Sequence, residues 1–224
     1  MKPTTLSNHA IQINRESIHY PRRLLDLYDP PDSLYIYGDI NLLKMPMLAI
    51  VGSRNATREG LNSARLFAQA LSKAGALIVS GLAKGVDSAA HQATLELGPK
   101  YRTAAVLGTG IDLVYPRQNT ELSEAIRHQG LLISELPLGT GPKAFHFPRR
   151  NRLIAALSLG VVVIEAAERS GSLITARLAA DLGREVFALP GLIHNPNSAG
   201  CHRLIQQGAK LAFTPNDVLE ELNF

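Results

Sequence analysis

Six short apolar runs, repeated at intervals between residues 47 and 189, constrain the fold of this chain more than any other feature. Each run is continuous rather than alternating, as expected for strands that are covered on both faces. Each run has four or five residues, most of them Val, Ile, Leu or Ala, and the run at residue 161 begins with three valines. The runs lie at residues 47–51, 76–80, 103–107, 131–134, 161–165 and 185–189.

Amphipathic segments of helical length separate most of these runs. Gly75 and Gly183 stand where the helices of two such segments, 61–76 and 172–183, would end, because glycine is the common residue just beyond a helix C-terminus. Alternating strands and helices predict an α/β fold: a doubly wound, mostly parallel sheet of the extended Rossmann-like kind, with helices on both faces. A short strand at 210–214 and a helix at 216–222 would complete it.

The segment before residue 46 shows a different pattern. Prolines at positions 21, 30 and 31 interrupt its periodicity, so an irregular lead-in with one short helix is expected. It is too short to bury a core of its own. We therefore expect residues 1–45 to form an N-terminal extension packed on the core, and residues 46–224 to form a Rossmann-like domain that carries the binding site.

The amino-acid composition excludes a disordered or a fibrous protein. Hydrophobic residues make up 46% and charged residues 19%, as in ordinary globular proteins. The net charge of +4 weakly favours a polyanionic partner. Cys201 is the only cysteine, so an internal disulfide is excluded and a reducing compartment is expected. Residues 1–20 lack a signal-peptide pattern and no apolar run is long enough for a bilayer, which predicts a cytoplasmic protein without membrane contact.

The loops that follow the predicted strands point to the kind of ligand. In open parallel sheets, ligands bind beyond the carboxyl ends of the strands. Nearly all of these loops contain Gly or Ser and several contain a cation, as at 52–54, 80–91, 108–119 and 165–172. Such loops also occur for turn geometry alone. Because several converge on one sheet edge, they favour a ligand that carries phosphate.

Common nucleotide-binding and hydrolase motifs are absent from the sequence. No Gly-Lys pair is followed by Ser or Thr, so a P-loop is excluded. The first strand runs into GSRNATREG instead of GxGxxG, and no GxSxG nucleophile motif occurs. His194, Cys201 and His202 lack a second ligand pair, so no metal is expected. Asp87 and His91 have helical i, i+4 spacing, which fits an acid–base pair or a purely structural contact.

The stretch FHFPRRNRLIAALS, residues 145–158, concentrates arginines at the start of a helix. Pro148 suits a first helical turn, so Arg149, Arg150 and Asn151 are expected there together with a further arginine at 152. Cations at a helix N-terminus oppose the macrodipole, and three of them indicate an anionic ligand. The bland alternative is a solvated basic face with core phenylalanines. We assign Phe145 to the core, and Arg150 and Asn151 to function.

Taken together, these motifs resemble one known family. GSR at 52–54, SGLAKGVDSAAH at 80–91, GTGIDLVYPRQN at 108–119, FPRRNRLIAALS at 147–158, EAAERSGSLITA at 165–176 and GREVFALPG at 183–191 resemble the DNA-processing protein A family, also called Smf. The resemblance implies a Rossmann-like core that binds single-stranded DNA, usually as a homodimer. It implies a recombination mediator that protects incoming strands and helps to load the RecA recombinase in natural transformation. No catalytic reaction, cofactor or metal is implied.

The resemblance also implies which residues contact DNA. It places contacts on Ser53, Arg54, Gly108, Gly110, Phe147, Arg150, Asn151, Ser170 and Ser172. The same segments add Gly52, Arg117, Asn119, Arg149 and Gly171 as candidate contacts. Many members carry an N-terminal helical domain and a C-terminal winged helix, which these 224 residues do not contain.

Two other functions fit parts of the pattern. The first is a hydrolase that processes nucleotides or nucleoside monophosphates, on the sheet plan of the cytokinin-activating phosphoribohydrolases. Such an enzyme would use a PGGxGT-type loop with a catalytic carboxylate, for which Glu135 or Glu165 are the candidates, whereas the corresponding region reads ERSGSLIT. The second is a scaffold for protein assembly with a vestigial pocket.

Overall fold

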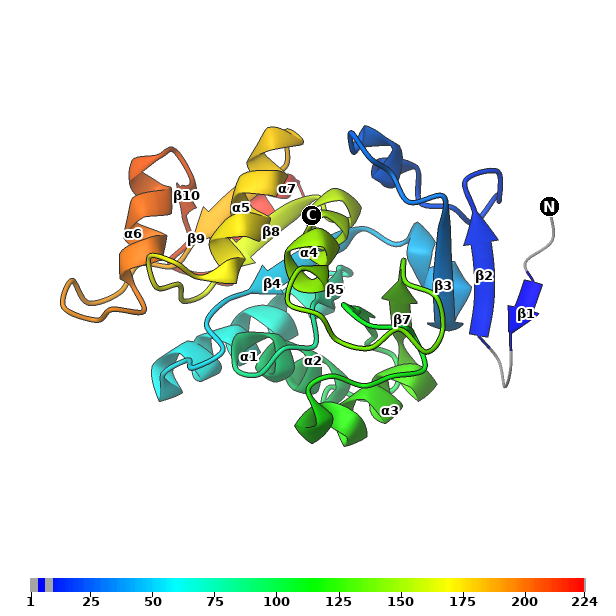
Figure 1. Ribbon diagram of the computed structural model, residues 1–224. Coiled ribbons are helices and arrows are strands. Elements are labelled where there is room, and N and C mark those ends of the chain that lie inside the picture. The colour runs from blue at the N-terminus through cyan, green and yellow to red at the C-terminus, as the bar shows by residue number, and fades with distance from the viewer. Residues whose placement is uncertain (1–3, 7–9, 224) are drawn as a thin grey trace.

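A single twisted sheet organises the molecule in the computed structural model, which describes residues 4–6 and 10–223 (Figure 1). Ten strands form this sheet in the described part of the chain. In spatial order they are β1 (Thr4–Leu6), β2 (Ala10–Asn14), β3 (Ser33–Gly38), β7 (Leu131–Ser134), β6 (Thr103–Val106), β5 (Leu77–Ser80), β4 (Met47–Val51), β8 (Gly160–Val163), β9 (Glu185–Ala188) and β10 (Lys210–Leu211).

The six apolar runs form β4 to β9, and all neighbouring pairs among these strands are parallel. Every residue of β4 to β8 is buried, in keeping with continuous rather than alternating apolar patterns. The predicted α/β fold with a mostly parallel sheet is therefore confirmed. Parallel strands also place their following loops at one edge of the sheet.

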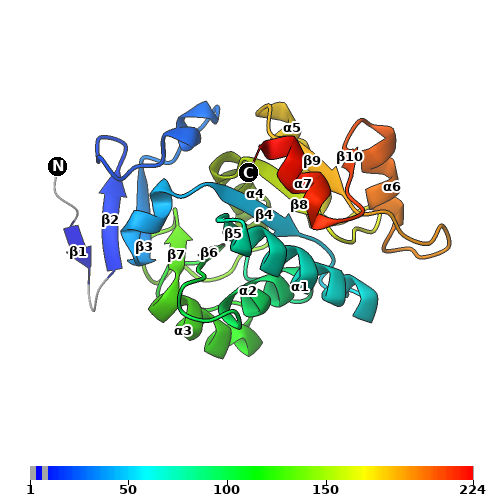
Figure 2. The ribbon, with the colours of Figure 1, turned by 180° about the vertical axis from the view of Figure 1, so that it is seen from behind.

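Helices cover both faces of the sheet (Figures 1 and 2). One face carries α1 (Arg58–Lys73), α2 (Val86–Leu95), α3 (Thr120–Gln129) and α7 (Pro215–Leu222). The other carries α4 (His146–Leu157), α5 (Gly171–Asp181) and α6 (Ala199–Gln206), together with the 3-10 helix η1 (Arg22–Asp26). Two more 3-10 helices are η2 (Ile40–Lys44) and η3 (Arg117–Asn119).

Helix α1 shows how the sequence builds these layers. Ala64, Phe67 and Leu71 recur at helical spacing and are buried against the sheet. Burying one such large side chain contributes about 1.5–3 kcal/mol. The Thr57 side chain accepts a hydrogen bond from the Gly60 amide (3.0 Å) and so caps the helix. As predicted, Gly75 and Gly183 follow α1 and α5 with φ of +103° and +67°.

The N-terminal segment differs from the expected irregular lead-in. It forms three strands, and β3 extends the sheet by antiparallel pairing with β7, where Ile36 lies opposite Ile133. In β3, Leu34 and Ile36 alternate with more exposed residues, the period of a β-strand, and Ile13 of β2 is buried opposite Leu34. They join the core beneath α4 and α5. The prolines lie between the strands, where they hide this period from a reading by composition alone.

The C-terminal elements lie close to the positions expected from the sequence. The strand expected at 210–214 is limited to β10, and the expected final helix is α7, which Thr214 and Asp217 cap. Across the described residues, no helix combines the length and apolar character that a membrane crossing requires.

Candidate functional site

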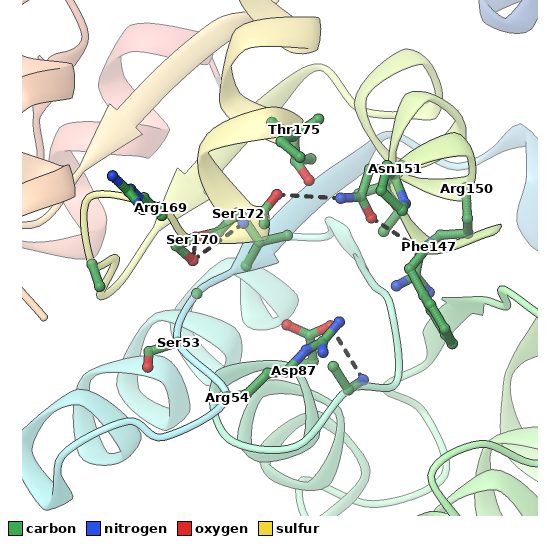
Figure 3. Close-up of a pocket in the computed structure, with 18 of the residues that line it drawn as sticks. Ser53, Arg54, Asp87, Phe147, Arg150, Asn151, Arg169, Ser170, Ser172 and Thr175 are labelled. Carbon is green, nitrogen blue, oxygen red and sulfur yellow. Dashed lines mark hydrogen bonds between the residues drawn. The ribbon is translucent and has the colours of Figure 1, made fainter. Parts of the chain in front are cut away.

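A cavity of about 730 Å³ opens at the carboxyl edge of the sheet (Figure 3). It lies between the loop after β4, the first turns of α4 and the N-terminus of α5. Nine of the fourteen predicted contact residues line it: Gly52, Ser53, Arg54, Phe147, Arg150, Asn151, Ser170, Gly171 and Ser172. The topology thus brings together loops that lie more than one hundred residues apart in the sequence.

The loop after β4 carries a cation into this cavity. Gly52 is required for its close packing, because a Cβ there would lie 2.9 Å from the carbonyl oxygen of Glu165. The Ser53 hydroxyl accepts a hydrogen bond from the Asn55 amide (3.1 Å) and turns the loop. Arg54 is exposed, and its guanidinium lies 5.9 Å from the centre of the Phe147 ring. No acid in the described chain pairs with Arg54.

An aromatic pair forms one wall of the cavity. The rings of Phe147 and Tyr115 lie with their centres 5.3 Å apart. Gly108 makes room for this arrangement, because a Cβ at that position would lie only 2.8 Å from Cδ1 of Phe147. Gly108 therefore acts through Phe147 and does not itself line the cavity. Tyr115 was missed by the sequence analysis, although it lies within the quoted GTGIDLVYPRQN motif.

Arg150 lies at the same wall but is only 5% exposed. Its Nη1 donates to the carbonyl oxygens of Gly81 (2.6 Å) and Val106, and its Nε donates to Oδ1 of Asn151 (3.1 Å). Burial lowers the pKa of Arg150 to about 10, and attraction to Asp87 opposes that shift. The side chain thus joins the ends of β5 and β6 to α4, a more structural position than the sequence indicated.

Asp87 and His91 do not form the acid–base pair considered from their spacing. The Asp87 carboxylate accepts hydrogen bonds from the amides of Gly81 (3.0 Å) and Ala83 (3.3 Å). His91 instead lies 2.7 Å from the Thr103 hydroxyl through Nδ1. Burial, with a contribution from Arg150, lowers the pKa of His91 to about 3, so its imidazole is neutral near pH 7. Burial raises the pKa of Asp87, and Arg150 opposes this shift.

The N-terminus of α5 faces the cavity opposite the aromatic pair. Ser170 caps this helix by accepting a hydrogen bond from the Ser172 amide (3.3 Å), and the two hydroxyls lie 2.6 Å apart. Nδ2 of Asn151 donates to the Gly171 carbonyl (3.2 Å), which ties α4 to α5. Free amides and the helix dipole at such a terminus favour an anion.

Two further cations line the cavity that the sequence analysis did not select. Lys143 and Arg169 both lie in loops after parallel strands, and the general enrichment of such loops in cations was the available signal. With Arg54 and Arg150 they give four cations against one acid, Asp87, on the cavity walls. Asp87 is buried and already bonded, so the cavity is electropositive.

Phe145 was assigned wrongly to the core. It is the N-cap of α4 and is 64% exposed, while the next residue, His146, is buried. The helix also begins two residues before Pro148, so Arg149 and Arg150 follow its first turn. Phe145 does not line the cavity, and its ring lies near Lys143 (5.9 Å from Nζ to the ring centre).

Five predicted contacts lie outside the cavity: Gly108, Gly110, Arg117, Asn119 and Arg149. Asn119 is buried and donates to the Leu82 carbonyl (2.8 Å) and the Ser88 hydroxyl (3.0 Å), so it holds the loop before α2. The amide of Gly110 donates to the Thr140 carbonyl (2.8 Å). Roles in DNA contact for these five residues stay predictions.

Glu135 and Glu165, the candidate catalytic carboxylates of the hydrolase alternative, are bonded to other side chains outside the cavity. The Glu135 side chain is 6% exposed and pairs with Arg149 (3.4 Å) and Arg152. Glu165 accepts hydrogen bonds from the amide (2.9 Å) and hydroxyl (2.6 Å) of Thr57 and so fixes the start of α1. Neither lines the cavity. Among residues 10–223, no three His, Cys, Asp or Glu side chains gather as metal ligands.

Comparison with known proteins connects this geometry to a family. The family model described as DNA recombination-mediator protein A matches residues 12–223. Protein Smf of Escherichia coli (strain K12) is 47% identical over 218 residues, which are 97% of this chain and 58% of that protein. The DNA processing protein DprA of Streptococcus pneumoniae is 49% identical over 205 residues, or 92% of this chain and 72% of the relative. The chain thus spans between about half and three quarters of these relatives.

Solved structures agree with the sequence matches. The crystal structure of DNA processing protein A from Streptococcus pneumoniae has a TM-score of 0.91 at 47% identity, over 95% of this chain and 74% of the other. A structure that describes the single-stranded DNA binding mode of DNA processing protein A from Helicobacter pylori has a TM-score of 0.85 at 34% identity, over 95% of each chain. Molybdenum cofactor carrier proteins at 16–18% identity share the fold alone.

Proposed function

Because the chain belongs to the DNA recombination-mediator protein A family, we propose that its electropositive cavity binds single-stranded DNA without catalysing a reaction on it. One observation carries the proposal: exposed Arg54, Lys143 and Arg169 share a single cavity with the ring of Phe147. Cations of this kind bind phosphates, and an aromatic ring stacks on a base whose face is free.

The aromatic wall favours a single strand over a duplex. A base inside a duplex is stacked on both faces, so it offers no free surface to Phe147 and Tyr115. An unpaired base can lie against Phe147 while its flanking phosphates approach Arg54 on one side and the N-terminus of α5 on the other. This arrangement binds any base, because each base has an aromatic face.

The family supports three further proposals about partners and setting. A mediator delivers its strand to a recombinase, so we propose that RecA is a protein partner and that strand protection and RecA loading serve natural transformation. We also propose a homodimer. The single cysteine, Cys201, is unpaired and buried, which raises its thiol pKa to about 12 and accords with a proposed cytoplasmic location.

A titration of fluorescent oligo-dT and of the matching duplex, at several salt concentrations, tests the proposed function. Wild type is expected to prefer the single strand and to weaken steeply with salt. Arg54→Ala should reduce the magnitude of the log–log salt slope by about 0.7, the contribution of one neutralised phosphate on a single strand.

Lys73→Ala provides the matched control, because Lys73 is an exposed cation at the end of α1 and does not line this cavity. It should leave the slope nearly unchanged. Binding that ignores salt, that prefers the duplex, or that falls equally in both variants would refute the proposed site.

A further inference from the structure

A second cavity, of about 700 Å³, lies on the other side of α5, between that helix and α6. Both helices cover the same face of the sheet as α4 (Figure 1). The N-terminal end of β9 and the turn after α6 close its floor. Its lining residues are Leu173, Ala176, Arg177, Ala180, Gly183, Arg184, Glu185, Val186, Gly200, Arg203, Leu204, Gln207, Gly208 and Ala209.

Three arginines and one acid line this groove, which gives it a positive charge. Arg177 on α5 and Arg203 on α6 are both exposed, and within the described chain neither side chain has a hydrogen bond or an ion pair. The acid, Glu185, is paired with Lys210 (3.2 Å). Two unpaired guanidinium groups therefore line the groove from opposite helices.

Arg184 adds a third guanidinium at the base of the groove. Its Nη2 pairs with Asp26 (2.5 Å) and also donates to the Ala156 carbonyl (3.4 Å), so its charge is already partly compensated. Arg23 lies close enough that its pKa is lowered, chiefly by burial and further by repulsion from Arg184. Asp26 opposes that repulsion. The cations that a bound anion would stabilise are therefore Arg177 and Arg203, which have no acid partner among the described residues.

Helix α5 places the two cavities back to back. Its Ser172 and Thr175 line the first cavity, whereas Ala176 and Arg177 line the second. The helix has 11 residues and is therefore only about 16 Å long. A flexible polyanion held on one side of so short a helix can reach the other side.

We propose that the groove between α5 and α6 is a second phosphate-binding segment, which takes the backbone of the same DNA strand after it leaves the first cavity. The inference rests on the proposed function of that cavity. Guanidinium groups bind phosphate oxygens in a planar, bidentate way, and the groove offers no aromatic ring to stack on a base. The segment therefore adds affinity and salt dependence without base preference.

Strand length separates the two cavities in an experiment. A short oligo-dT of about 6 nucleotides occupies the first cavity, and one of about 20 nucleotides also reaches the groove. For the long strand, Arg177→Ala/Arg203→Ala should weaken binding roughly tenfold at low salt and reduce the slope by about 1.4, the contribution of two phosphates. The short strand should bind the double variant and wild type equally.

Two variants serve as controls. Arg177→Lys/Arg203→Lys keeps both charges and should retain most of the salt slope, and Lys73→Ala should bind like wild type. Because Arg177 and Arg203 are exposed and unpaired, the double alanine variant should keep the wild-type unfolding transition. If the double alanine variant loses its unfolding transition but the double lysine variant binds the long strand normally, the result still supports the groove.

The outcomes that overturn the inference are distinct from failure of the proposed function. If the short strand binds in an Arg54-dependent way and the long strand is unaffected by the double alanine variant, the first cavity stands and the groove is refuted. If the double variant loses a fluorescent ATP analogue but not the long strand, the groove binds free nucleotide instead. If neither strand binds wild type, the proposed function itself fails.

Discussion

Arg150 and Asp87 both hydrogen-bond to the backbone of Gly81: Arg150 donates to its carbonyl oxygen (2.6 Å), and the Asp87 carboxylate accepts from its amide (3.0 Å). Gly81 is a glycine for this reason, because a Cβ there would lie 2.5 Å from the Arg150 guanidinium. Both charged groups are buried. Together they fix the loop after β5 at the wall of the first cavity.

Replacing Arg150 by alanine is expected to destabilise the fold, so that weaker DNA binding by this variant would not by itself identify a direct contact. The change leaves the buried carbonyls of Gly81 and Val106 without their donor and should lower the free energy of unfolding by about 2–6 kcal/mol, at about 1–3 kcal/mol for each group. Urea unfolding measures this loss. Arg54→Ala, at an exposed site, should stay within about 0.5 kcal/mol of wild type. Equal stability of the two variants would show that Arg150 is not the structural link described above.

Replacing Phe147 by alanine should weaken binding of single-stranded DNA and leave its salt dependence unchanged, since the lost contact is a stack and not a charge. A stacked base contributes about 1–3 kcal/mol by alanine substitution. Fluorescence anisotropy with oligo-dT at two salt concentrations measures both quantities. Phe145→Ala removes a neighbouring, exposed ring that does not line the cavity. If Phe145→Ala weakens binding as much, the stacking role of Phe147 is wrong.

The stability of the protein should fall as pH drops below about 6.5, because of His91. In the folded state burial lowers its pKa to about 3 from the ordinary value of 6.5, so the unfolded chain binds an extra proton between these values. Stability is therefore fully present above pH 6.5 and is lost toward pH 3, by up to roughly 1.4 kcal/mol per pH unit.

Urea unfolding of wild type and His91→Gln at pH 7.5, 6 and 5 isolates this effect. The difference between the two proteins should shrink as pH falls, since only wild type has to take up the proton on unfolding. Asp87 shifts in the opposite direction but is present in both. His128→Gln, at an exposed site, should follow the wild-type profile. A constant difference between wild type and His91→Gln would contradict the buried, neutral imidazole.

The parallel part of the sheet was predictable because buried strands have a strong sequence signature. The runs that became β4 to β9 are apolar on both faces and are separated by amphipathic helices. Strands β2 and β3 escaped because partly exposed residues interrupt their buried ones, Ile11 and Gln12 in β2 and Tyr35 in β3. An alternating pattern of four to six residues between prolines is easily mistaken for a loop.

The location of the cavity was also predictable, but the environments of its arginines were not. Arg54, Arg149 and Arg150 look alike in sequence, yet one is exposed and unpaired, one pairs with Glu135 and one is buried among carbonyl groups. Those differences depend on residues brought close by the fold. Lys143 and Tyr115 were missed for the same reason, since each comes from a loop whose path a single sequence does not specify.

The pairing of β3 with β7 covers a strand edge that would otherwise favour aggregation. Without residues 1–45, the backbone groups of Leu131–Ser134 that now bond to β3 would be left open along one side of the sheet. Open edges of apolar strands readily recruit strands from other molecules. The first strands thus act as a guard against aggregation, whichever function the cavity on the neighbouring strands performs.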